Sequence, residues 1–202
     1  MKAILFDLDG VLVDSVPLIA EAWKRACTQF NIKPAPWKKV NGTNPASFIN
    51  ALLPGKEAAF LAAFQKHIAE NRDSLMLFPG AKATIRRLMR QYKVGITTSA
   101  PESYLLFIKK KFGLPYDACL SLHPPLKDKP APDIHLAMAK MLGVLPEDCL
   151  VVEDGLVGIL AAKSAGMKAV AISNPYLADA SKADKVIKKL SDLTIPFIEK
   201  LG

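Results

Sequence analysis

From residue 79 onward, short apolar runs alternate with amphipathic stretches of helical period, and this rhythm limits the folds open to the chain. Strands are expected at residues 93–98, 118–121, 149–152 and 168–172, each preceded by a helical stretch. A further apolar run, at residues 2–6, opens the chain. Right-handed crossovers place helices on both faces of a parallel sheet, so the alternation predicts an α/β fold built on a parallel sheet.

A purely helical segment interrupts this rhythm directly after the first expected strand. Helices are expected there at residues 16–30, 44–53 and 57–72, with no strand between them. We interpret residues 16–78 as a small helical cap, inserted into a core that is made of residues 1–15 and 79–202. The connections near Asp14 and Pro79 are then the two hinges between cap and core.

The composition is that of a chain that folds around a substantial core, since half of the 202 residues are hydrophobic and 23% are charged. The apolar runs have the length of strands, so we expect no membrane-spanning helix. The first run ends at Asp7, so we expect no signal peptide. Three cysteines lie far apart in apolar surroundings (Cys27, Cys119 and Cys149). This pattern favours reduced thiols in a cytoplasmic protein over disulfides or a metal site.

The formal net charge is +8, and the basic residues gather in the second half of the chain, for example at Lys109-Lys110-Lys111. One explanation is contact with nucleic acid. The other is solvated helix faces, together with a mild field that attracts anionic substrates. No recognition motif or aromatic stacking platform accompanies the lysines, so we favour the second explanation and expect no nucleic-acid partner.

Acidic side chains directly follow two of the expected strands. Asp7-Leu8-Asp9-Gly10 comes after residues 2–6, and Glu153-Asp154-Gly155 comes after residues 149–152. An Asp-Gly step is also common in turns, and an aspartate can cap a helix. Adjacent acids repel each other, however, and this cost is usually offset by a bound cation or used in catalysis. Because ligands bind at the carboxyl ends of parallel strands, we expect both acid pairs in one site.

Three hydroxyls and a lysine occupy comparable places. Thr97-Thr98-Ser99 ends the expected strand at residues 93–98, and Lys129 lies in a segment stiffened by prolines. Taken alone, Thr98 would be a helix cap and Lys129 a surface charge. Taken with the acid pairs, they complete a set of polar groups at strand ends.

This set of groups is suited to phosphoryl transfer. Asp7, Asp9 and Asp154 can hold Mg²⁺, which prefers few protein oxygen ligands and several waters. Lys129 and Thr98 can stabilise the equatorial oxygens of a phosphoryl group. A carboxylate can accept that group and form an aspartyl-phosphate.

The motifs resemble, in order and spacing, those of the haloacid dehalogenase (HAD) superfamily. They are Phe6-Asp-Leu-Asp-Gly-Val-Leu-Val-Asp-Ser15, Thr98, Lys129-Pro-Ala-Pro-Asp133 and Glu153-Asp-Gly-Leu-Val-Gly158. The chain looks most similar to the branch with a helical cap after the first strand, which includes phosphoglycolate-phosphatase-like and beta-phosphoglucomutase-like enzymes. The resemblance implies a Rossmann-like parallel sheet core with the HAD fold.

The resemblance also implies a role for each motif residue. Asp7 would be the nucleophile, and Asp9 would act first as general acid and then as general base. Thr98 would bind the phosphoryl group together with the backbone of Ser99. Lys129 would link the charges of the nucleophile and the phosphoryl group.

The implied cofactor is Mg²⁺, held by Asp7, the backbone carbonyl of Asp9 and Asp154, with Glu153 in support. Substrate specificity would reside in the cap, where Gly42-Thr43-Asn44 resembles the substrate-specificity loop of the superfamily. A small cap suits a small phosphorylated metabolite.

We therefore expect a cytoplasmic, Mg²⁺-dependent phosphatase that hydrolyses a sugar phosphate or a phosphoglycolate-like compound through an aspartyl-phosphate. The alternative is a sugar-phosphate mutase similar to beta-phosphoglucomutase. Ile19 stands where that pattern has a histidine, and Ala100-Pro101 stands where it has Ser-Lys, which favours the phosphatase. We expect a monomer or a weak homodimer.

Overall fold

The computed structural model describes residues 1–35, 49–50, 52–175, 177 and 179–201. Its centre is a six-stranded sheet with the strand order β3-β2-β1-β4-β5-β6, in which all neighbouring strands are parallel. The strands are β1 (Ala3–Asp7), β2 (Lys93–Thr98), β3 (Ala118–Ser121), β4 (Cys149–Glu153), β5 (Lys168–Ile172) and β6 (Lys185–Ile187). The predicted α/β fold with a parallel sheet is therefore confirmed.

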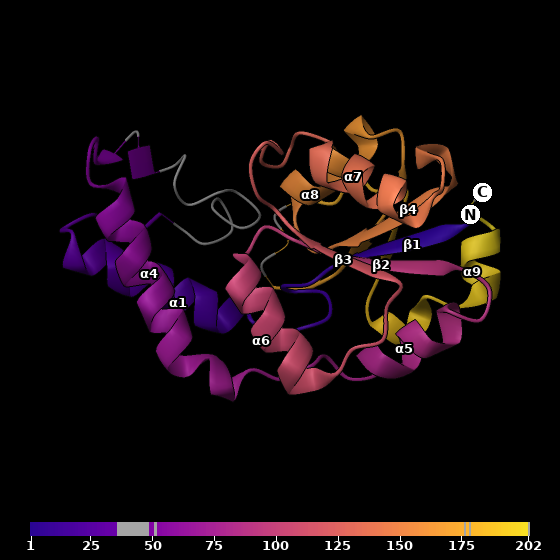
Figure 1. Cartoon of the computed structure of the whole chain (residues 1–202), viewed down its shortest axis with the longest axis horizontal. Helices are drawn as coiled ribbons and strands as arrows, with labels where there is room; N and C mark the ends of the chain where they lie inside the picture. The colour runs from indigo at the N-terminus through magenta and orange to yellow at the C-terminus, as the bar shows by residue number, and fades with distance from the viewer. Residues whose placement is uncertain (36–48, 51, 176, 178, 202) are drawn as a thin grey trace.

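Helices cover both faces of this sheet (Figure 1). On one face lie α5 (Ala81–Leu88), α6 (Glu102–Phe112) and α9 (Ile195–Glu199), and on the other lie α7 (Asp133–Leu142) and α8 (Leu156–Ser164). Every residue of β1 and of β4 is buried, as expected for strands covered on both sides. Two short 3₁₀ helices, η2 (Pro146–Asp148) and η3 (Leu190–Asp192), complete the core.

One predicted boundary was wrong, and one strand was missed. The helix expected at residues 81–92 ends at Leu88 and continues as turns. β6 was not expected, because it is a strand of three residues within a lysine-rich segment and two of them are exposed. An edge strand of this kind lacks the apolar run that marks a buried strand.

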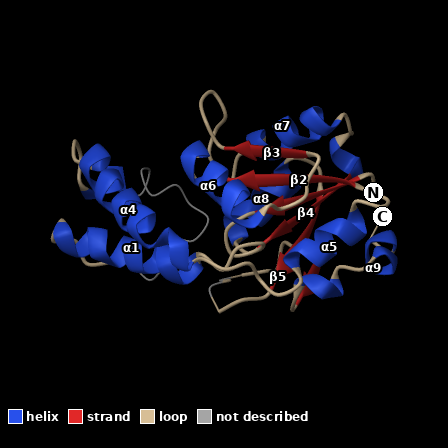
Figure 2. Cartoon of the chain, turned by 60° about the horizontal axis from the view of Figure 1, so that its bottom comes forward, coloured by secondary structure: helices blue, strands red, loops and turns tan. Residues whose placement is uncertain are grey.

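A helical insert follows β1 and packs around its own small core. Among the described residues it contains α1 (Val16–Gln29), α4 (Glu57–Asn71) and the 3₁₀ helix η1 (Arg72–Ser74), and Figures 1 and 2 show α1 and α4 side by side, away from the sheet. Trp23 of α1 meets Phe60 of α4 edge to face, with ring centroids 5.4 Å apart. The expected helix at residues 44–53 lies mostly outside the described residues.

The two connections between insert and sheet lie next to each other. Val13 forms an antiparallel bridge with Leu77. The amide of Asp14 donates to the carbonyl of Met76 over 2.9 Å, and the amide of Phe78 donates to the carbonyl of Leu12 over 3.0 Å. The segments that we predict as hinges therefore form one short ladder, and a rotation of the insert has to bend both of them.

The strand order reverses at β1, because the chain moves from β1 to β2 and β3 on one side and through β4 to β6 on the other. Asp7 pairs with Thr97, and Phe6 pairs with Val152. The carboxyl ends of β1, β2 and β4 consequently meet at one edge of the sheet, where ligands of such folds bind. Within the described part of the chain, no helix is long and apolar enough to cross a membrane.

Candidate active site

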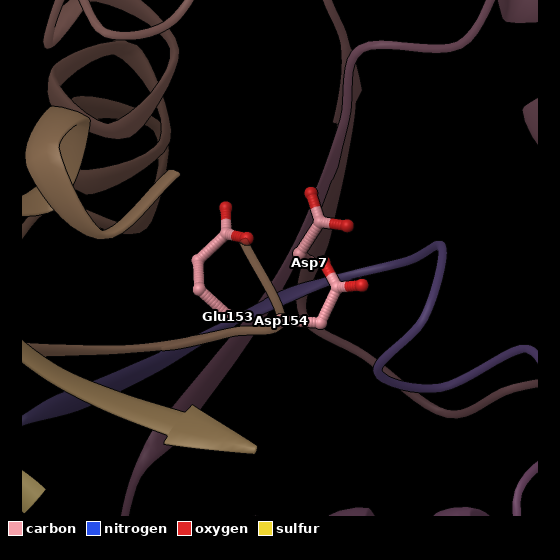
Figure 3. Close-up of side chains that lie close together, drawn as sticks. All are labelled: Asp7, Glu153 and Asp154. Atoms are coloured by element: carbon pink, nitrogen blue, oxygen red, sulfur yellow. The ribbon is translucent and has the colours of Figure 1, made fainter. Parts of the chain in front are cut away.

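Three buried carboxylates meet at this edge of the sheet (Figure 3). Asp7 is the last residue of β1, Glu153 is the last residue of β4, and Asp154 follows directly. Each contributes one oxygen to a group in which all the oxygens lie within 4.8 Å of one another. We call this group the acid triad. Hard oxygen donors at this spacing are suited to a divalent cation.

Lys129 reaches into the acid triad from the loop before α7. Its Nζ donates to Asp7 Oδ1 over 2.7 Å and to Glu153 Oε1 over 2.6 Å. The three side chains are at least nine-tenths buried, so solvent screens this ion pair weakly. Lys129 is therefore not a solvated surface lysine.

The electrostatics of the cluster keep Lys129 charged. Burial opposes the charge, but the carboxylates of Asp7 and Glu153 outweigh it and raise the pKa of Lys129 above its ordinary value. Burial and the negative charge of Asp7 raise the pKa of Glu153. One ammonium stands against three carboxylates, so the cluster retains an excess of negative charge that a cation would offset.

Two glycines let the backbone approach these carboxylates closely. A Cβ at Gly10 would lie 2.1 Å from Asp154 Oδ2, and Gly10 also has a φ of +77°. A Cβ at Gly158, in α8, would lie 2.1 Å from the carboxyl group of Glu153. Any other residue at either position would displace an oxygen of the acid triad.

The Asp9 carboxyl group stands apart from the acid triad and accepts three hydroxyl hydrogen bonds. Ser15 donates to Oδ1 over 2.6 Å, Tyr104 donates to Oδ1 over 2.8 Å, and Thr98 donates to Oδ2 over 3.1 Å. Burial and the charge of Asp7 raise the pKa of Asp9, and the three hydroxyls offset part of that shift. A carboxyl group in this setting is suited to carrying a proton.

Thr98 makes a second contact, in which its Oγ1 accepts a hydrogen bond from the amide of Ala100 over 3.0 Å. It therefore also stabilises the turn before α6, the structural role that the sequence left open. Ser99 is exposed beside it.

The structure brings the predicted core residues to one place, although their individual roles remain predictions. They are Asp7, Asp9, Thr98, Lys129, Glu153 and Asp154. The predicted loop Gly42-Thr43-Asn44 lies outside the described residues.

Three neighbours of the site were not predicted as site residues. Asn174 donates to Asp154 Oδ2 over 3.2 Å, and it follows β5 closely, so the criterion of polar residues after strands could have found it. Ser15 ends the first motif, but no role at the site was predicted for it. Tyr104 lies inside an amphipathic helix, where a tyrosine usually belongs to the core, and no local signal marks it.

The fold and site define the class of protein. Residues 1–166 match the family described as haloacid dehalogenase-like hydrolase, and the chain belongs to this family of hydrolases. The resemblance seen in the motifs is thereby confirmed.

Two relatives are similar over nearly their whole length. The chain is 31% identical to the beta-phosphoglucomutase of Bacillus subtilis, over 99% of this chain and 95% of that protein. It is also 31% identical to hexitol phosphatase A of Escherichia coli, over 96% of this chain and 94% of that protein.

A solved structure shares the fold. A mutant of CbbY from Rhodobacter sphaeroides, crystallised in complex with xylulose 1,5-bisphosphate, aligns with a TM-score of 0.82 and 22% identity over 96% of each chain. The ligand of that protein is a phosphorylated sugar.

Proposed function

We propose that this protein is a Mg²⁺-dependent phosphatase that hydrolyses a small phosphorylated metabolite, a sugar phosphate or a phosphoglycolate-like compound. The observation that carries the proposal is Lys129 Nζ, which lies 2.7 Å from Asp7 and 2.6 Å from Glu153 within the acid triad. This contact holds the Asp7 carboxylate in place beside a fixed positive charge. The similarity to a hexitol phosphatase and to a sugar-phosphate mutase supports the substrate class.

The residues present fit a magnesium ion. The acid triad supplies three oxygen ligands at the right spacing, and the close approach of Gly10 and Gly158 keeps two of its carboxylates in place. Asp7 and Asp154 would hold the ion together with the Asp9 carbonyl, with Glu153 in support. When bound, the ion neutralises charge on the phosphoryl oxygens.

Asp7 is the nucleophile of the proposed reaction. Its Oδ1 accepts from Lys129 and its Oδ2 accepts from the amide of Asp9 over 3.1 Å, so both oxygens have a defined direction. One oxygen attacks phosphorus, the bond from phosphorus to the ester oxygen breaks, and an aspartyl-phosphate forms. Lys129 and the Thr98 hydroxyl stabilise the charge on the equatorial oxygens.

Asp9 moves the protons of both half-reactions. It donates a proton to the departing ester oxygen, which leaves as an alcohol. Asp9, now a carboxylate, then accepts a proton from the water that attacks the aspartyl-phosphate, and phosphate and free Asp7 are released. The acid is thereby regenerated for the next turnover.

The insert supplies specificity in this proposal. Residues 16–78 act as a cap over the strand ends, and Gly42-Thr43-Asn44, outside the described residues, would contribute to substrate specificity. Closure of the cap would exclude water while the ester bond breaks.

The residues of this chain at the positions that distinguish mutases from phosphatases support hydrolysis. Ile19 packs against the apolar core of the insert and Ala100 against that of the sheet. Neither side chain can hold a sugar hydroxyl or a second phosphate. Each such contact contributes roughly 1–3 kcal/mol when it is charge-assisted, so water has the advantage in the competition for the aspartyl-phosphate.

The test is phosphate release from a panel of phosphorylated metabolites in the presence of Mg²⁺, with the Asp7→Asn variant as control. A second assay supplies beta-glucose 1-phosphate with a trace of the 1,6-bisphosphate and follows glucose 6-phosphate and phosphate together. We expect phosphate release in the first assay and no rapid isomerisation in the second. Glucose 6-phosphate forming much faster than phosphate would establish the mutase instead.

A further inference from the structure

We propose that Tyr104 is a positioning residue that holds the Asp9 carboxyl group for proton transfer to the leaving oxygen. This inference rests on the proposed phosphatase function and adds a residue to its site. The Tyr104 hydroxyl donates to Asp9 Oδ1 over 2.8 Å. The two residues are 95 positions apart in the sequence, and the hydrogen bond joins α6 to the loop that follows β1.

Tyr104 is held rigidly. Its residue is only 8% exposed, and its ring belongs to the main core with its helical neighbours Leu105 and Ile108. A tyrosine ring has two rotatable bonds, and packing of the ring restrains both. The position of its hydroxyl is therefore determined by the core of the protein.

The other two hydroxyls that bond Asp9 are expected to move during the reaction cycle. Ser15 immediately precedes α1, so it would move when the cap rotates. Thr98 would turn its hydroxyl toward a phosphoryl oxygen when substrate binds. Among the three hydroxyl donors described here, Tyr104 is the one on a core helix with no expected contact to substrate. It can hold Asp9 throughout the reaction cycle.

The consequence concerns the leaving group. An alkoxide or a phenolate of high basicity needs the proton from Asp9 as the bond to phosphorus breaks, whereas 4-nitrophenolate leaves without one. Misplacing Asp9 should therefore slow the cleavage of demanding esters and spare the activated one. Loss of a core contact alone would affect both esters alike.

The experiment compares Tyr104→Phe with the parent on phenyl phosphate and 4-nitrophenyl phosphate, which differ little in shape. The measured quantity is kcat/KM, since it reports the steps up to phosphoryl transfer to Asp7. We expect kcat/KM for phenyl phosphate to fall about tenfold or more, and that for 4-nitrophenyl phosphate to change less than about twofold. KM for phenyl phosphate should change little.

The matched control is Tyr92→Phe. Tyr92 has the same 8% exposure in the same core, and it lies outside the site. This variant should keep the parent kcat/KM on both esters, and unfolding curves confirm that each variant is folded. An equal fall on both esters, or no fall on phenyl phosphate, overturns the role of Tyr104. If the parent enzyme releases phosphate from no phosphate ester at all, the proposed function is overturned instead.

Discussion

Gly158 offers a quantitative test of how the acid triad is held. It lies inside α8, where alanine is normally more stable than glycine by about 1 kcal/mol. Here the added Cβ would lie 2.1 Å from Glu153 Cδ and Oε1, whereas ordinary contact begins at 3.4 Å. Gly158→Ala therefore requires the carboxyl group to move by about 1.3 Å, the difference between these two distances.

The expected cost follows from the surroundings of Glu153. Its residue is 2% exposed, so the carboxylate cannot swing into solvent, and Lys129 Nζ is bonded to it over 2.6 Å. Breaking a buried ion pair costs roughly 3–5 kcal/mol. After subtraction of the helix gain, we expect the free energy of unfolding to fall by about 2–4 kcal/mol. For a chain of this size, that corresponds to a Tm lower by about 5–15 °C.

The assay is urea and thermal unfolding of a double-mutant cycle with Glu153→Ala. In the Glu153→Ala background the carboxyl group is absent, so a Cβ at position 158 meets no clash there. Gly158→Ala should then be neutral or slightly stabilising. The reasoning is refuted if Gly158→Ala leaves the parent as stable as before. The same loss in the Glu153→Ala background would refute it equally, because the clash would then not involve Glu153.

Three further outcomes are expected. Asp7→Asn should lower turnover by several orders of magnitude, since it deletes the nucleophile. Its Tm should stay close to that of the parent, because the asparagine keeps an oxygen for Lys129 and relieves repulsion among the three carboxylates. One-tenth of the parent rate would contradict covalent catalysis. Chelation of the metal should abolish activity and lower the Tm, and added Mg²⁺ should restore both. Excess Ca²⁺ should inhibit the enzyme, because Ca²⁺ prefers more ligands than Mg²⁺. Full activity in the presence of chelator would contradict the metal site. Burial and the charge of Lys129 lower the pKa of His135 to about 3, against 6.5 for a free histidine. The unfolded chain therefore takes up a proton below pH 6.5 that the folded protein does not, and from pH 6.5 to about 4.5 stability should fall by about 2 kcal/mol more in the parent than in His135→Leu. Urea unfolding at both pH values measures this difference, and equal losses would contradict it.

The sequence by itself determined the architecture and most of the site. Strand–helix alternation is a local property, and a buried strand ends where its apolar run ends. Asp7, Thr98 and Glu153 could therefore be placed at strand ends before any contact was known. All parallel strands point the same way, so these ends had to share one edge of the sheet.

The tertiary structure alone decided how the side chains are paired at that edge. Lys129 and Asp7 are 122 positions apart, and nothing local in either segment indicates a 2.7 Å contact. Tyr104 has the sequence pattern of an ordinary core residue, yet packing of its ring aims the hydroxyl at Asp9. The need for glycine at position 158 likewise appears only when α8 lies against Glu153. Periodicity reports which face of an element is buried, whereas the direction of one polar atom depends on packing between elements far apart in the chain.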